Sequence, residues 1–232
     1  MTVENRILAK LSPAVLHRLE PHLVQVDFEQ GKTIYGPGEP LSHLYFPTGC
    51  LFSVTITMQD GATAEVGMFG SQEVLGLNAL MGGVATAQTE CAVQVAGSAL
   101  KIEVPVVRQE FDRNGELRDV MLRCTQAFLA QVSQTAACNS LHTLEQRLPR
   151  WLLGTQERVH SDYLPLTQEF IATMLGVRRA GVTQAAQKLQ EQKLIRYRRG
   201  NVQILDQAGL EEAACECFQR IRTEYDRLLG DL

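Results

Sequence analysis

Residues 166–205 have the sequence LTQEFIATMLGVRRAGVTQAAQKLQEQKLIRYRRGNVQIL, and this stretch decides the fold. Thr167 offers a hydroxyl N-cap for a first helix, and Gly176 permits a tight turn after it. A second helix begins near Arg178 and repeats apolar residues every three or four positions through Leu189. Two short helices joined by such a turn predict a helix-turn-helix.

A small β-hairpin is predicted directly behind the second helix. Residues 194–197 and 202–204 flank Arg199-Gly200-Asn201, a turn typical of a hairpin that carries arginines at its tip. From Arg178 to Arg199 seven residues are basic and only Glu191 is acidic, although the whole chain has a net charge of −4. This local excess of positive charge favours contact with phosphate.

The N-terminal half of the chain has the period of β-strands. Apolar and polar residues alternate over 24–28, 52–58 and 63–68, and Asp60-Gly61 predicts a hairpin turn between the last two segments. A final strand over 89–95 and its partner around 100–102 close the unit. Glycine and proline recur at short intervals, as in an antiparallel sandwich or barrel. We therefore expect an α+β chain whose first domain, 1–113, is an antiparallel β-barrel.

A long amphipathic helix is predicted over 114–138. Its apolar residues fall three or four apart, and about 24 residues would extend roughly 36 Å. The narrow stripe suits pairing with a second copy of the chain, although a helix packed only on its own domain has the same pattern. The residues expected to form the dimer contact are Leu117, Met121, Cys124 and Phe128.

Composition limits the classes of function. The 232 residues are 45% hydrophobic and 21% charged, and they contain neither a membrane-spanning stretch nor a secretion signal, so we expect a cytoplasmic protein of two domains. The sequence contains no Ser/His/Asp or P-loop spacing that would indicate an enzyme. Cys215 and Cys217 lack the C-x-x-C spacing and would point in different directions on a helix. We therefore expect no metal and no cofactor.

The order of barrel, long helix and winged helix-turn-helix resembles the Crp/Fnr family, which includes the cyclic-AMP receptor protein and the fumarate-nitrate regulator. The resemblance is carried by GKTIYGPGEPLSHLYFPTGCLFSV, residues 31–54, and more specifically by residues 166–205. It implies a cyclic-nucleotide-binding-like jelly roll, and a winged helix-turn-helix domain over 139–232 with an extra C-terminal helix. The implied function is a homodimeric transcription regulator that binds a palindromic operator in double-stranded DNA and contacts RNA polymerase.

In this family the first residues of the second helix supply the base contacts. An arginine fork matches the two acceptors on guanine, and a glutamine amide matches adenine. The corresponding positions here are Arg178, Arg179, Ala180, Thr183 and Gln184. A helix N-terminus and flexible cations suit phosphate instead, and the residues of this kind are Thr167, Lys188, Arg198 and Arg199.

The effector pocket departs from the family pattern. Relatives that bind cyclic nucleotide carry a glutamate for the ribose and an arginine for the phosphate. Here the glutamate position, next to Leu75, is Val74, and the arginine position, before Thr86, is Ala85. Because both charged contacts are missing, we do not expect cyclic AMP to bind in the usual way, and any effector stays unidentified. Glu73 lies one residue before the family's glutamate position. It is expected to be either a displaced polar contact of the pocket or a solvent-facing loop residue.

A ligand-sensing or protein-interaction module, whose winged helix docks on a protein, is the alternative function. A protein-docking face should carry exposed apolar anchors. The second helix is instead expected to expose arginine, threonine, glutamine and lysine, so the sequence favours DNA.

Overall fold

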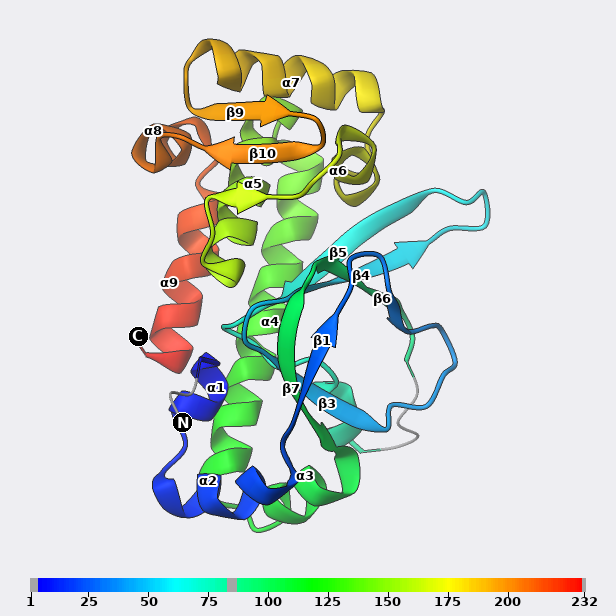
Figure 1. Cartoon of the computed structure of the whole chain (residues 1–232), viewed down its shortest axis with the longest axis vertical. Helices are drawn as coiled ribbons and strands as arrows, with labels where there is room; N and C mark the ends of the chain where they lie inside the picture. Colours follow the sequence, from blue (N-terminus) through cyan, green and yellow to red (C-terminus); the bar gives the residue numbers. More distant parts are fainter. Residues whose placement is uncertain (1–3, 83–86, 231–232) are drawn as a thin grey trace.

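The computed structural model describes residues 4–82 and 87–230. Figure 1 shows two lobes arranged along one long helix, α4 (Glu116–Leu141): a β-sheet lobe beside its lower part and a helical lobe with a small sheet at its upper end. Ala85 and Thr86 lie outside the described residues. Within the described ranges, none of the helices is long and apolar enough to cross a bilayer.

The N-terminal lobe is a jelly-roll-like sandwich of two antiparallel sheets, so the predicted fold class is confirmed but the barrel is not closed. The sheets have the orders β1-β7-β3 and β2-β6-β4-β5. The strands are β1 (Val24–Phe28), β2 (Thr33–Tyr35), β3 (His43–Pro47), β4 (Leu51–Thr57), β5 (Thr63–Phe69), β6 (Glu90–Val95) and β7 (Gly97–Glu103). The expected pairing of β6 with β7 is wrong, because the chain passes from one sheet to the other between them.

The predicted hairpin is confirmed and connects β4 to β5. Thr57 pairs with Thr63, and Met58 N–H closes the turn on the carbonyl of Ala62 at 2.8 Å. The interior of the sandwich is filled by aromatic rings in edge contact, with Phe28 and Phe52 centroids 5.3 Å apart. Packing of this kind leaves the lobe with a core of its own.

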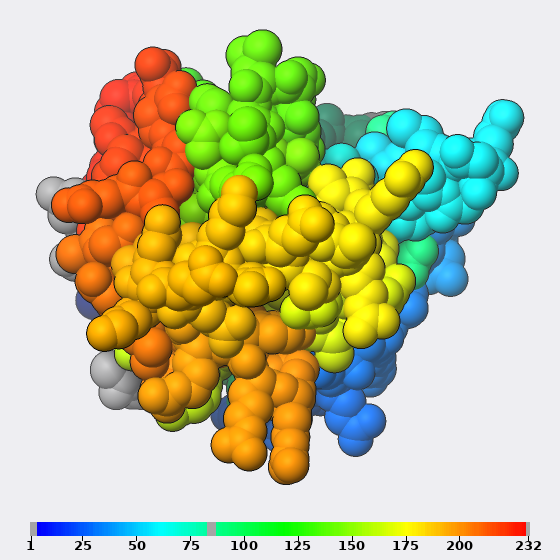
Figure 2. All heavy atoms as spheres, turned by 90° about the horizontal axis from the view of Figure 1, so that it is seen from above, coloured from blue at the N-terminus to red at the C-terminus, as the bar shows by residue number. Residues whose placement is uncertain are grey.

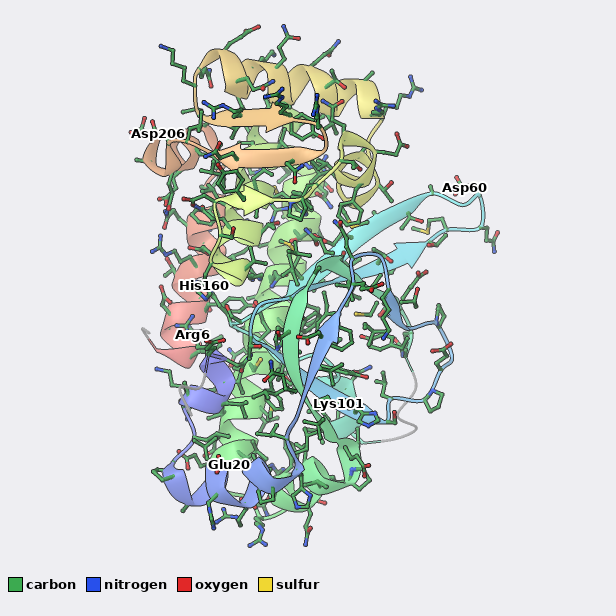
Figure 3. The ribbon with its side chains drawn as sticks, in the orientation of Figure 1. Arg6, Glu20, Asp60, Lys101, His160 and Asp206 are labelled. Carbon is green, nitrogen blue, oxygen red and sulfur yellow. The ribbon has the colours of Figure 1, made fainter. Side chains whose placement is uncertain are left out.

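Short helices surround the sandwich. They are α1 (Arg6–Ala9), α2 (Pro13–Leu19), the 3-10 helices η1 (Glu20–His22) and η2 (Leu77–Leu80), and α3 (Val104–Phe111). Figure 3 labels Arg6 where the N-terminal helix meets the last helix of the chain, and its Nη2 lies 2.9 Å from Oδ1 of Asp226. The two ends of the chain are thereby joined.

The C-terminal lobe contains the predicted winged helix-turn-helix. Its elements are α5 (Leu144–Val159), β8 (Tyr163–Leu164), α6 (Gln168–Leu175), α7 (Arg179–Glu191), β9 (Ile195–Arg198), β10 (Asn201–Ile204), α8 (Gln207–Ala213) and α9 (Cys217–Leu229). The expected single C-terminal helix is divided into α8 and α9. In Figure 1, α9 leaves the upper lobe and runs back beside α4.

Because α9 packs beside α4, the apolar stripe of α4 is not the dimer face that the sequence led us to expect. Leu117, Met121 and Cys124 are at most 1% exposed, and they share one core with α1 and α9. The fourth residue, Phe128, stacks on Phe69 of β5 with centroids 4.5 Å apart. The apolar side chains of the stripe therefore pack against other parts of the same chain. The sequence pattern did not reveal this because the partners of the stripe, which include α1, α9 and Phe69, are distant from it in the sequence.

Candidate nucleic-acid interface

The helix-turn-helix forms as its local sequence predicts. Thr167 Oγ1 accepts a hydrogen bond from the Phe170 N–H at 3.1 Å, which caps the start of α6. Gly176 ends α6 with φ of +62°, a backbone conformation that favours glycine. Arg178 is still extended, so Arg179 is the first residue of α7. Both arginines therefore stand at the N-terminal end of the helix.

One face of α7 is buried and the other is open to solvent. Val182, Ala185, Ala186 and Leu189 pack into the core of the lobe. Figure 2 shows α7 lying across the upper face of the molecule, with its outer side uncovered. The exposed residues include every predicted base-contact position and one predicted phosphate position, namely Arg178, Arg179, Ala180, Thr183, Gln184 and Lys188.

Acidic neighbours hold two of these cations only weakly. Lys188 Nζ lies 2.9 Å from Oε1 of Glu145, and Arg179 Nε lies 4.0 Å from Oε2 of Glu169. All four side chains are about half exposed or more. Exposed pairs of this kind are worth at most about 1 kcal/mol, so a phosphate can replace the carboxylates.

The wing stands beside the helix-turn-helix. Arg199 and Gly200 both have positive φ, as in a two-residue hairpin turn between β9 and β10. Arg198 and Arg199 are exposed at this tip. A Cβ on Gly200 would lie 3.3 Å from the methyl of Thr167, so the tip of the wing touches the start of α6. The predicted phosphate positions at the wing and at Thr167 are therefore adjacent.

Sequence reasoning missed two contributions to this face. Tyr197 lines a shallow pocket with Thr167, Gln168 and Arg179, and its hydroxyl donates to the Leu166 carbonyl at 3.0 Å. The tip of the β4-β5 hairpin, at residues 61–63, lines a groove with the α6-α7 turn and the first residues of α7. Figure 3 labels Asp60 at the end of this projecting hairpin. No local pattern in the hairpin indicates a contact more than 100 residues away.

The described residues of the expected effector pocket are buried and make contacts within the chain instead of facing a ligand. Val74 and Leu75 are buried at 0% and 1% exposure, and Leu75 exchanges backbone hydrogen bonds with Tyr45. Glu73 was expected on a solvent-facing loop or as a displaced ligand contact. It is instead 0% exposed and pairs with Arg158 of α5 at 2.7 Å. The remaining two positions, Ala85 and Thr86, are outside the described residues.

The cysteine pair of the C-terminal region also differs from expectation. Cys215 lies between α8 and α9, and Cys217 is the first residue of α9, so they do not share one regular helix. Their sulfur atoms lie in one group with Cys138 Sγ and a ring nitrogen of His142, all within 4.8 Å of one another. The geometric reason for expecting no metal site is therefore wrong.

Comparisons with known families match both lobes. Residues 25–114 match the cyclic nucleotide-binding domain, and residues 146–213 match the Crp-like helix-turn-helix domain. The chain is 26% identical over 219 residues to the CRP-like cAMP-activated global transcriptional regulator of Mycobacterium tuberculosis, covering 90% of this chain and 96% of that one. It is 23% identical over 194 residues to the global nitrogen regulator of Synechococcus elongatus, covering 80% and 87%.

Solved structures share the fold. FixK2 from Bradyrhizobium japonicum superposes with a TM-score of 0.71 at 15% identity, covering 83% of this chain and 98% of that one. The c-di-GMP responsive regulator CLP from Xanthomonas campestris superposes with a TM-score of 0.67 at 17% identity, covering 83% and 99%.

Proposed function

Because the chain belongs to the Crp/Fnr family of transcription regulators, we propose that it acts as a homodimer on a palindromic operator, with α7 in the major groove. One observation carries this proposal: the outer face of α7 is uncovered and made of arginine, threonine, glutamine and lysine. Side chains at the start of a helix can enter a major groove together. The scarcity of exposed apolar anchors there disfavours a protein-docking face.

The residues of this face divide into two roles. Arg178, Arg179 and Gln184 lie on the outer face of α7 and have the donors to read guanine or adenine edges. Ala180 and Thr183 offer methyl groups suited to thymine. The remaining residues sit around the helix and at the wing, where they would hold phosphates without reading sequence. These positioning residues are Thr167, Lys188, Arg198 and Arg199.

The dimer contact is assigned to the opposite face of α4. Leu122 and Leu129 lie seven residues apart, two turns along the same side, and are 49% and 60% exposed. Exposed leucines aligned on a long helix suit a two-fold helix pair. Such a pair would place two copies of α7 about 34 Å apart, one turn of DNA.

Control by an effector would act through the contact between the two lobes. The helix α4 continues to Leu141, and the backbone is extended at His142 and Thr143 before α5 begins. We infer that the hinge lies at these two residues, four positions after the Cys138-Asn139 junction expected from the sequence. The missing glutamate and arginine disfavour cyclic AMP as the effector. A contact with RNA polymerase, as the family implies, completes the proposed regulatory role.

Selection of binding sites from random duplex DNA tests this function. The full-length protein should enrich one short sequence repeated in inverted orientation, with half-site centres about 10 base pairs apart. Enrichment of a sequence without two-fold symmetry would contradict the dimer. If no sequence is enriched at low salt, the exposed face of α7 docks on something other than DNA.

A further inference from the structure

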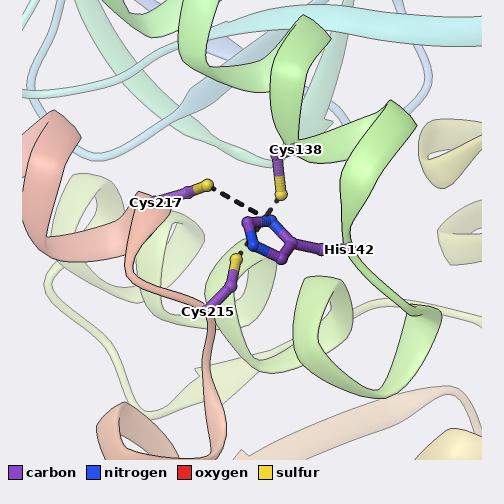
Figure 4. Close-up of side chains that lie close together, drawn as sticks. All are labelled: Cys138, His142, Cys215 and Cys217. Atoms are coloured by element: carbon purple, nitrogen blue, oxygen red, sulfur yellow. Dashed lines mark hydrogen bonds between the residues drawn. The ribbon is translucent and has the colours of Figure 1, made fainter.

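Four side chains that bind metals well in other proteins meet at the end of α4. Cys138 lies in its last turn and His142 is its C-cap, while Cys215 precedes α9 and Cys217 is the first residue of α9 (Figure 4). The three cysteines are at most 4% exposed and form a cluster separate from the larger apolar cores. Segments 73 or more residues apart thus bring three sulfurs and one imidazole to one point.

The spacing of the four ligand atoms fits a tetrahedral ion. Cys138 Sγ lies 3.5 Å from Cys215 Sγ, and Cys217 Sγ lies 3.5 Å from His142 Nδ1. In a tetrahedral zinc site, bonds of about 2.3 Å to sulfur and 2.0 Å to nitrogen place neighbouring ligand atoms about 3.5–3.8 Å apart. Since all four atoms already lie within 4.8 Å of one another, small side-chain adjustments complete the site.

The surroundings orient these ligands as in known metal sites. His142 Nε2 faces Oε2 of Glu216 at 3.2 Å, which leaves Nδ1 toward the sulfurs. A carboxylate on the far ring nitrogen is the usual partner of a metal-bound histidine. Gln134 Nε2 donates to Cys217 Sγ at 3.0 Å, a contact that a thiolate accepts more strongly than a thiol.

Buried positive charge supplies a second, independent argument. Arg147 and Arg150 are 7% and 6% exposed, and the Nε of each has no hydrogen-bond partner. Among the described residues neither guanidinium has a carboxylate within 4.0 Å. Buried charges are normally paired. A divalent ion with three thiolates and one neutral imidazole has a net charge of −1. Both arginines interact electrostatically with Cys138 and would balance this charge, although Arg150 also interacts with the buried carboxyl of Glu65.

We propose that Cys138, His142, Cys215 and Cys217 bind one Zn²⁺ ion, which fastens the end of α4 to the start of α9 beside the hinge at His142 and Thr143. Zinc fits best because the set combines three soft thiolates with one imidazole, has four ligands and is buried, as in closed structural sites. The evidence for this site does not rest on the DNA-binding function proposed above.

Metal analysis of the full-length protein, purified without a polyhistidine tag, tests the site. The expected result is one zinc per chain, with a dissociation constant below about 100 nM. Protein stripped by a chelator should bind Co²⁺ and develop thiolate charge-transfer and tetrahedral ligand-field absorption. Single Cys215→Ser and His142→Ala variants should lose the zinc. The matched variants Cys50→Ser and Cys124→Ser change buried cysteines outside the cluster and should retain it.

Two further measurements make the result decisive even if a ligand variant fails to fold. Glu216→Gln changes only the partner of His142 and should weaken zinc affinity about 10–100-fold. Stripped wild-type protein that keeps its circular dichroism but binds neither Zn²⁺ nor Co²⁺ would overturn the proposal. A Cys138–Cys215 disulfide in protein purified under reducing conditions, or zinc retained by both ligand variants, would overturn it equally.

Discussion

Arg158 of α5 donates from Nη2 to Oε1 of Glu73 at 2.7 Å, and the two side chains are 4% and 0% exposed. This ion pair joins the sandwich to the DNA-binding lobe inside the protein. The same junction requires Gly70, where a Cβ would lie 2.4 Å from Cβ of Arg158. The two lobes are therefore locked by a specific contact, which any effector that rotates them must break.

Removing one partner of this ion pair should destabilise the protein strongly. Glu73→Gln removes the hydrogen-bonded carboxylate partner of the buried Arg158 guanidinium, so the free energy of unfolding should fall by about 3–5 kcal/mol. Glu224→Gln is the control, because it breaks the exposed pair with Arg227, which solvent screens, and it should leave stability nearly unchanged. Urea unfolding measures both. Equal effects of the two variants would show that Glu73 and Arg158 are not paired in solution.

Glu65 should make stability depend on pH. Burial raises the pKa of this carboxyl to about 7, although hydrogen bonds from Ser53 Oγ and Trp151 Nε1 oppose the shift. Between its ordinary value of 4.5 and about 7 the folded chain keeps a proton that the unfolded chain has lost. Stability contributed by this group therefore falls as pH rises through that window, by roughly 3 kcal/mol in total.

Thermal unfolding of wild type and Glu65→Gln across that window isolates the effect of Glu65. The variant has no proton to lose, so the wild type should lose stability relative to it as pH rises from 5 to 7.5. A constant difference between the two proteins would mean that the carboxyl titrates normally.

The dimer should depend on the outer face of α4. Leu129→Glu places a charge in the proposed helix pair and should convert the dimer to a folded monomer in sedimentation at micromolar concentration. Leu205→Glu, at a residue 45% exposed beyond β10, is the control and should leave the dimer intact. Phe128→Glu should instead destabilise the single chain, because Phe128 packs on Phe69. A wild-type monomer would contradict both the dimer and the palindrome.

Cyclic AMP should not bind usefully. Val74 occupies the position of the family glutamate and is 0% exposed, and Glu73 is already paired with Arg158. Without these contacts, the sugar and phosphate would lose charge-assisted hydrogen bonds worth about 1.5–3 kcal/mol each. Isothermal titration calorimetry should detect no binding at micromolar concentration. A dissociation constant in the low micromolar range would refute this interpretation.

The sequence predicted features that depend on neighbouring residues. The cap at Thr167, the turn at Gly176 and the hairpin around Asp60-Gly61 are each set by local backbone preferences, and each is found in the structure. The predicted base-contact positions lie on the exposed side of α7, opposite the buried stripe that its helical period indicates. A single helix period is enough to separate the buried face from the exposed one.

Features that depend on distant partners could not be predicted in this way. The stripe beginning at Leu117 is the same in sequence whether α9 or a second subunit covers it. Glu73 becomes buried because Arg158, 85 residues later, folds against it. Likewise Cys138 and Cys215 are 77 residues apart and meet only through the return of α9. Chain topology decides these three contacts.

Binding of Arg179 and wing variants to selected and random duplex DNA tests the central claim that α7 reads sequence. Arg179→Ala should weaken binding to the selected site by about 1–3 kcal/mol and relax selectivity at one symmetric pair of positions. Arg198→Ala at the wing should weaken all duplexes similarly and reduce the salt slope by about 1.8 per dimer. Arg220→Ala removes an exposed charge on α9 and should change neither. If Arg179→Ala weakens selected and random DNA equally, α7 does not read bases.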